Sequence, residues 1–179
     1  MPLSDQQGMY FPMVGGNPMA GSFTTLQQPG HLGKKFEYNV GTEDKPLWVT
    51  LRLVKLAAVT AAIGEVLYWS DRDDYVVTNV ADGGVIAGIV PAGTGAVAPS
   101  SGGYFFMVVK GRLPVKYLDS VTIAPDTAGK LAVGSATNGR ADCVTDGSAV
   151  VNLILGRTAG TQDTGTKLAT TDINVFDQA

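Results

Sequence analysis

The sequence predicts a mainly β protein, formed by a single antiparallel β-sandwich or barrel-like domain with an extended N-terminal arm. The chain has 179 residues, which is the length of one domain with an appended segment. Beyond residue 45 it consists of short runs rich in Val, Ile, Tyr and Phe, and turn residues separate these runs. Turns at this frequency favour antiparallel strands over alternating βαβ units.

Residues 1–45 are expected to form the arm. They contain Gly-Gly-Asn-Pro and Gln-Gln-Pro-Gly segments and show neither helical nor strand periodicity. A flexible terminus is the alternative, but exposed aromatic side chains cost solvation free energy unless something buries them. We therefore expect a binding partner to bury the aromatic side chains of the arm, which are Tyr10, Phe11, Phe23, Phe36 and Tyr38.

Residues 46–179 are expected to form the β-rich domain. Its first strand is indicated by Leu47, Val49 and Leu51, which alternate with Trp48 and Thr50. The Ala-rich segment 56–63 is compatible with a short helix. Further strands are expected at residues 65–70, 75–80, 85–90, 104–110, 115–117, 120–123, 130–133, 141–144 and 150–155, followed by a Gly/Thr loop at 158–166 and a last strand at 167–175.

Sharp turns are expected between these strands, because Gly and Asn tolerate the positive φ angles that tight hairpins require. The turn sequences are Asp82-Gly83-Gly84, Ser101-Gly102-Gly103, Asn138-Gly139 and Asp146-Gly147.

The composition indicates a weakly charged surface. Charged residues make up only 16% of the sequence, and the net charge is -3. Such a surface solvates poorly, so it favours a chain whose exposed faces are covered by other chains. The sequence contains no basic tract, so we expect no direct binding of nucleic acid.

No targeting or membrane-spanning segment is evident. The start, Met1-Pro2-Leu3-Ser4-Asp5, lacks both basic residues and a following apolar run. No stretch reaches about 18 uninterrupted apolar residues. We expect no membrane partner, and a protein that is kept in a soluble compartment or is released by a route that needs no signal peptide.

The single histidine argues against an enzyme. A general base near neutral pKa is most often histidine, and His31 lies between glycines in the arm, far from any nucleophile signature. We interpret it as a surface or interface residue. We expect no catalytic activity and no cofactor, since the glycine-rich stretches match no phosphate-binding motif.

Two other features resemble binding sites but are better explained structurally. Asp71-Arg72-Asp73-Asp74 clusters carboxylates of the kind that bind Ca²⁺, yet the EF-hand spacing is absent, so we predict a solvated turn. Cys143 is the only cysteine, which excludes an internal disulfide and a cysteine-based zinc site, and we expect a small buried structural side chain. No metal site is therefore expected.

A glycan-binding β-sandwich module is an alternative function of a different class. Flat aromatic rings can stack on the apolar faces of sugars. Trp48, Trp69 and Tyr68 would then have to line one exposed face.

A succession of motifs carries a family resemblance. In order along the chain they are Ala61-Ala62-Ile63-Gly64-Glu65-Val66-Leu67-Tyr68, Ile86-Ala87-Gly88-Ile89-Val90, Gly103-Tyr104-Phe105-Phe106-Met107-Val108-Val109-Lys110-Gly111, Asp126-Thr127-Ala128-Gly129-Lys130-Leu131, Ala136-Thr137-Asn138-Gly139-Arg140-Ala141 and Leu155-Gly156-Arg157. From residue 61 onward, about two-thirds of the chain resembles the small β-rich head decoration, or capsid cement, proteins of tailed bacteriophages.

The resemblance implies a structural virion protein that binds the outside of an assembled capsid, commonly as a trimer, and holds major capsid protein subunits together. The expected partners are the major capsid protein and further copies of this chain. The expected location is the outer capsid surface of the virion, after synthesis in the host cytoplasm. Residues 1–45 depart from the compact members of the family, which leaves open whether the arm contacts the capsid or neighbouring copies. Another virion component, such as a head-fibre base or a tail protein, is the alternative.

Overall fold

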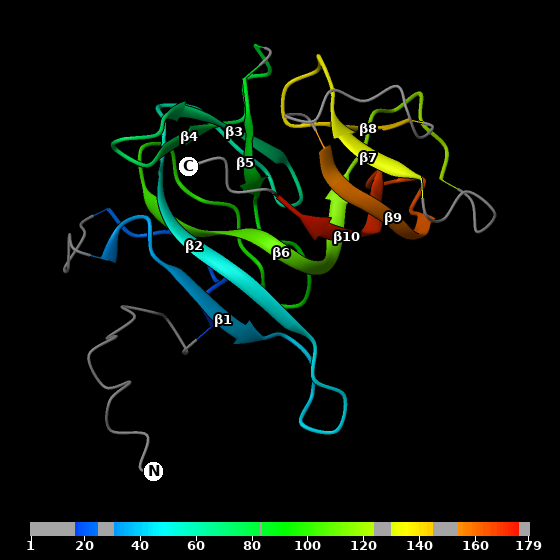
Figure 1. Cartoon of the computed structure of the whole chain (residues 1–179), viewed down its shortest axis with the longest axis horizontal. Helices are drawn as coiled ribbons and strands as arrows, with labels where there is room; N and C mark the ends of the chain where they lie inside the picture. Colours follow the sequence, from blue (N-terminus) through cyan, green and yellow to red (C-terminus); the bar gives the residue numbers. More distant parts are fainter. Residues whose placement is uncertain (1–16, 25–30, 83, 124–129, 145–153, 176–179) are drawn as a thin grey trace.

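The computed structural model describes residues 17–24, 31–82, 84–123, 130–144 and 154–175. Within these residues the protein is almost entirely β, with ten strands and no α-helix (Figure 1). The predicted fold class is therefore confirmed. The strands divide into a closed barrel and a second sheet that continues from it.

Five strands close the barrel. They are β2 (Trp48–Leu56), β3 (Val66–Asp71), β4 (Val76–Thr78), β5 (Ile86–Ile89) and β6 (Tyr104–Lys116), in the order β2-β4-β3-β5-β6, and β6 pairs back to β2. Four of the five pairings are antiparallel, and only β2 and β4 run parallel. Closure removes the free edges from this part of the molecule.

The second sheet grows from the carboxyl half of β6. Its order is β6-β10-β9-β7-β8, with β7 (Leu131–Gly134), β8 (Ala141–Val144), β9 (Ile154–Gln162) and β10 (Leu168–Asn174). A bridge between Tyr117, which follows β6, and Ala141 in β8 brings the two edges of this sheet together. The 13-residue strand β6 thus belongs to both halves of the molecule.

Gly111 marks the point where β6 passes from one half to the other. The pairing of β2 with β6 ends irregularly at Thr50 and Lys110, and the pairing of β10 with β6 starts there. Gly111 has φ +132°, and a Cβ at this position would lie 2.7 Å from a methyl carbon of Val49. Glycine is therefore required for the strand to bend at this point.

Strand β1 (Lys35–Asn39) changes the predicted boundary at residue 45. It pairs antiparallel with β2, and Figure 1 shows it lying along β2 over its whole length. Phe23 also exchanges backbone hydrogen bonds with Tyr104 of β6. The sheet thus begins eleven residues before the predicted domain, and the expectation of no strand in the arm is wrong for residues 35–39. Flanking Gly and Pro hid a strand of only five residues.

Alternation of side chains along the strands builds two apolar clusters. The first draws on all five barrel strands and fills the barrel; it includes Val54, Leu56, Leu67, Val77, Ala87, Phe105 and Met107. The second lies on the opposite faces of these strands and extends under the second sheet; it includes Leu51, Leu53, Val66, Tyr68, Phe106, Val108, Leu113, Val115, Tyr117, Leu155, Ala169 and Ile173.

Most strands lie where the sequence predicts them, but four segments differ. Residues 57–63 are not helical, because the backbone of Ala57 hydrogen-bonds to Val77 and Gly102. The segments at 104–110 and 115–117 form one strand, continuous through Pro114 to residue 116. Residues 120–123 form no strand, since Val121 instead closes a turn onto Leu118. Strand β9 continues to Gln162, into the predicted Gly/Thr loop.

Candidate interaction surfaces

The arm aromatics that the structure describes lie against the protein's own core. The Phe23 ring stacks on Tyr104, with centroids 6.1 Å apart, and the Phe36 ring meets Phe106 edge-on at 5.8 Å. Tyr38 packs partly buried against the same cluster. These contacts bury the three rings in part without a partner, and binding of a partner to them stays a prediction. Tyr10 and Phe11 lie outside the described residues.

His31 and Cys143 occupy structural positions. The His31 ring is half-buried and lies 6.5 Å edge-on from the Phe36 ring. Cys143 is half-buried in β8, and burial raises the pKa of its thiol above the ordinary value, opposed by nearby Lys130. A raised pKa keeps the sulfur in its unreactive thiol form.

The acidic cluster at residues 71–74 forms the turn that the sequence predicts. One carboxylate oxygen of Asp71 accepts hydrogen bonds from the backbone amides of Asp73 and Asp74, at 3.0 and 3.1 Å. All four residues are exposed. In the described part of the chain, no group of three or more His, Cys, Asp or Glu side chains is arranged to hold a metal ion.

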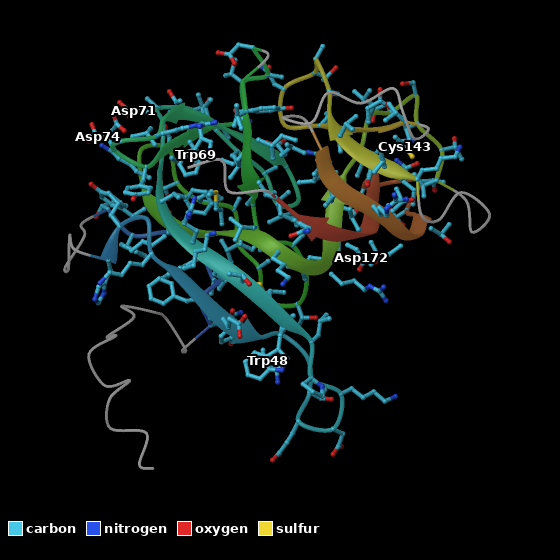
Figure 2. The ribbon with its side chains drawn as sticks, in the orientation of Figure 1. Trp48, Trp69, Asp71, Asp74, Cys143 and Asp172 are labelled. Atoms are coloured by element: carbon cyan, nitrogen blue, oxygen red, sulfur yellow. The ribbon has the colours of Figure 1, made fainter. Side chains whose placement is uncertain are left out.

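The three rings required for a glycan platform do not share a face. Tyr68 is only 1% exposed and belongs to the core, and its neighbour Trp69 packs against the barrel cluster. Trp48, by contrast, is 58% exposed. Figure 2 shows Trp48 and Trp69 on different sides of the molecule. These three rings therefore form no common exposed face.

The turn between β1 and β2 projects from the body of the protein (Figure 1). Its conformation is held by side-chain hydrogen bonds: Asn39 Oδ1 accepts from the amides of Gly41 and Leu47, both at 2.9 Å, and Thr42 Oγ1 accepts from the amide of Lys45. Residues 41–46 are all exposed. A projecting turn that is already ordered loses little conformational entropy when it binds.

This hairpin, residues 35–48, carries two features of an interaction element. Trp48 stands where the turn joins β2 and is 58% exposed, and Glu43 and Asp44 lie in the turn. Strand β1 is also at the end of the strand order, so among the described strands none pairs with its second edge. Free strand edges are templates for association with another chain.

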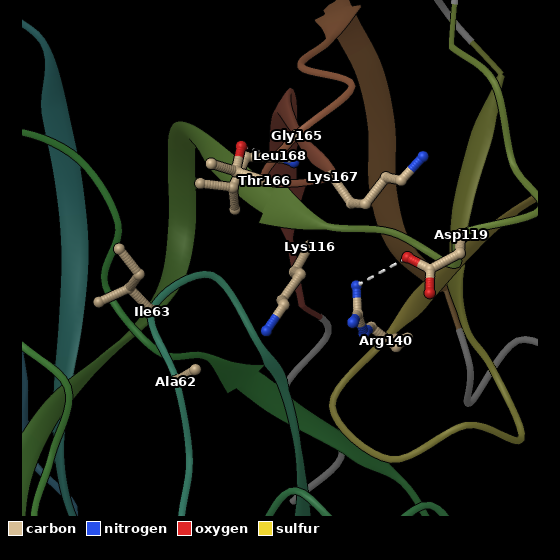
Figure 3. Close-up of a pocket in the computed structure, with 9 residues that line it drawn as sticks. All are labelled: Ala62, Ile63, Lys116, Asp119, Arg140, Gly165, Thr166, Lys167 and Leu168. Atoms are coloured by element: carbon tan, nitrogen blue, oxygen red, sulfur yellow. Dashed lines mark hydrogen bonds and ion pairs between the residues drawn. The ribbon is translucent and has the colours of Figure 1, made fainter.

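A pocket of about 400 Å³ lies where the two halves of the molecule meet. Figure 3 shows its charged side chains, which come from separate segments: Lys116 from β6, Arg140 from the turn before β8, and Lys167 from the turn before β10. The rest of the lining consists of Asp119 and of the uncharged residues Ala62, Ile63, Gly165, Thr166 and Leu168. Two further carboxylates lie close by, since Glu65 pairs with Lys116 and Asp163 accepts hydrogen bonds from the amides of Gly165 and Thr166.

Ion pairs hold two of the three cations in place. Lys116 Nζ lies 3.3 Å from Glu65 Oε1, and Arg140 donates to the carbonyl oxygen of Tyr117 at 2.9 Å while facing Asp119 at 3.7 Å. Lys167 is different. Its backbone is fixed at φ +61° by hydrogen bonds to Asp163 and Tyr117, and within the described residues its ammonium group forms no ion pair.

The pocket was not foreseen from the sequence, because its residues are separated by up to about a hundred positions and no local motif links them. The turn between β1 and β2 is only weakly indicated by the sequence. Thr42-Glu43-Asp44-Lys45 is a polar stretch directly before an alternating strand, which is typical of a turn.

Comparison with protein-family models found no match, and a search of curated proteins also found none. Among the residues whose placement is given, no helix is long and apolar enough to cross a membrane.

Proposed function

We propose that this protein is a capsid cement protein of a tailed bacteriophage. It binds the outside of the assembled capsid as a trimer and stabilises contacts between major capsid protein subunits. Its place is the outer surface of the virion, after synthesis in the host cytoplasm. It acts through binding alone, with no catalytic step.

The observation that carries the proposal is the hairpin formed by β1 and β2. It holds a 58% exposed tryptophan beside a strand edge that no described strand covers. Large apolar groups and open edges are unfavourable on a protein that stays monomeric. Tryptophan is also the residue type most enriched among the energetically dominant positions of protein interfaces.

The polar side chains outside the β1–β2 hairpin support a binding function without catalysis, because many of them bond to one another within the chain. Glu65 is bonded to Lys116, Asp172 is bonded through both oxygens to Arg112, and the Tyr117 hydroxyl is bonded to Thr171. A compact β body with a projecting binding element suits a protein whose task is to add buried area across joints between other subunits.

Many weak contacts can give strong reinforcement on a capsid. A trimer attaches through three equivalent sites, so its overall affinity exceeds that of one copy without any new contact. Binding only to the assembled state stabilises that state by mass action. Particles that lack the protein should therefore assemble normally but release DNA at lower temperature.

The test compares heat-induced DNA release from capsids stripped of the protein with release from the same capsids after purified protein is added back. Re-decoration should shift release to higher temperature. Trp48→Ala protein should give a smaller shift at limiting concentration, whereas Val80→Ala, which removes an exposed apolar side chain away from the hairpin, should act like the natural sequence. Coincident release curves for stripped and fully decorated capsids would contradict the proposal.

A further inference from the structure

We propose that the trimer forms by insertion of the hairpin tip of one copy, with the carboxylates of Glu43 and Asp44, into the pocket of the next copy, beside Lys167. The inference rests on the self-association contained in the proposed function and names the two surfaces that meet. The occupant of the pocket is thus a second copy of this chain.

The hairpin tip offers carboxylates that are free to bind. Glu43 and Asp44 are exposed, and neither takes part in an ion pair within the described residues. The backbone bonds between Thr42 and Lys45 fix the turn that presents them. The binding element is thus ordered before it meets its partner, which limits the entropy lost on association.

The pocket offers the complementary charge. Lys116 and Arg140 are held by carboxylates of their own copy, but the ammonium group of Lys167 is not. The carboxylates of Asp119, Glu65 and Asp163 balance the three cations in number, so the attraction for an incoming carboxylate comes from Lys167, the cation without an ion pair in the described residues. Partial exclusion of water strengthens such a contact.

Apolar side chains accompany the charges on both surfaces. Only four large apolar side chains of the described residues are exposed, and two of them are Trp48 beside the hairpin turn and Ile63 at the pocket. A contact between the two surfaces would remove both from water. Such a pattern, with an aromatic anchor next to charged groups, is usual in protein interfaces.

The two surfaces lie on different parts of the molecule. Figure 1 shows the β1–β2 turn at the bottom and the carboxyl end of β6, which contributes to the pocket, in the upper half. A contact between different surfaces of identical chains runs head to tail, and it closes into a ring when the rotation between copies allows. A trimer is the smallest such ring beyond a pair.

Charge reversal on each surface tests the inference, with light scattering and sedimentation at a series of protein concentrations as the measurement. Glu43→Lys and Lys167→Glu should each weaken trimer formation by at least tenfold, because each places like charges together. The matched controls reverse exposed charges elsewhere: Asp74→Lys in the turn after β3, and Lys130→Glu before β7. Both controls should leave the trimer unchanged.

Combining Glu43→Lys with Lys167→Glu in one chain should recover part of the lost affinity, because the reversed charges attract again. The inference is overturned if the two single variants behave like their controls, if the combination is no better than the single variants, or if the natural protein is a monomer. Thermal unfolding of each variant checks that the fold is retained.

Binding to stripped capsids separates this inference from the proposed function. If Glu43→Lys weakens capsid binding but leaves the free trimer intact, the hairpin docks on the capsid, and the inference fails while the cement function stands. If decoration gives no protection against heat, the cement function fails whatever the trimer contact is.

Discussion

The ammonium group of Lys116 lies 3.3 Å from a carboxylate oxygen of Glu65, and this ion pair joins the barrel to the second sheet. Glu65 is only 9% exposed and directly precedes β3, whereas Lys116 ends β6. The other carboxylate oxygen accepts hydrogen bonds from the amide of Ala62 and the side chain of Asn79. A nearly buried charge is tolerated here because all its donors converge on it.

Removal of the cation should therefore be costly. Lys116→Met leaves the Glu65 charge with two neutral donors, and we expect the free energy of unfolding to fall by about 1–3 kcal/mol. Arg112→Met is the matched control, because Arg112 lies on the same strand and face but pairs with Asp172 in solvent. Its effect should be clearly smaller. Urea denaturation measures both, and equal losses would show that the Glu65 pair adds nothing beyond an exposed one.

Gly139 should tolerate no side chain, because it has φ +67° and approaches Glu65 closely. A Cβ at this position would lie 2.7 Å from the Glu65 carboxyl carbon, and the Gly139 carbonyl also accepts from the amide of Val66. Gly102 has nearly the same φ, +71°, with open space around it. Gly102→Ala should cost about 1–2 kcal/mol of left-handed strain alone. Gly139→Ala should cost more, and thermal unfolding of the two variants would reveal an equal cost if the contact is unimportant.

The stability of the protein should fall in alkali because of Tyr68. Burial raises the pKa of this phenol from 10.0 to about 12. The hydrogen bond to the Ser135 carbonyl lowers the pKa, and the negative charge of nearby Asp82 raises it. Because the pKa of Tyr68 is higher in the folded than in the unfolded state, its protonated phenol contributes fully to the free energy of unfolding below pH 10.0. This contribution is lost as the pH rises toward 12. Burial raises the pKa of Tyr117 in the same direction.

Tyr68→Phe should therefore lose less stability than the natural sequence between neutral pH and the alkaline range, although it starts lower because the hydrogen bond is gone. Unfolding by urea at several pH values gives the comparison. Parallel pH profiles for the two proteins would contradict the assignment.

Local patterns predicted the strands well where a strand has one buried face. In β2, Val49, Leu51 and Leu53 point to the core, and their spacing is visible in the sequence. The helix expected at 56–63 failed because helix propensity is a weak preference, and the backbone hydrogen bonds of Ala57 with Val77 in β4 and with Gly102 override it.

The candidate surfaces were harder to foresee because they depend on long-range packing. The burial of Phe36 requires Phe106, which lies 70 positions away and reaches it only when β6 closes against β2. Lys116 and Lys167 likewise become neighbours of one pocket only through the pairing of β6 with β10. No short motif encodes such closeness, so composition alone suggested that a partner buries the aromatic rings.

Substitutions at Phe36 and Trp48 should distinguish the stability of the fold from the proposed association. The two residues lie three rungs apart on the same hairpin, because Phe36 pairs with Leu51 and Asn39 pairs with Trp48. The Phe36 ring contacts Phe106 of the core, so Phe36→Ala should destabilise the free protein by about 1.5–3 kcal/mol. Trp48 is 58% exposed, so Trp48→Ala should change the free energy of unfolding by no more than about 0.5 kcal/mol.

For association, the order of the two variants should be reversed. Trp48→Ala should weaken the trimer at low concentration. Phe36→Ala, measured well below its unfolding temperature, should weaken the trimer less. Sedimentation and urea denaturation on the same two preparations decide the matter, and a Trp48→Ala protein that associates like the natural sequence would remove Trp48 from the interface.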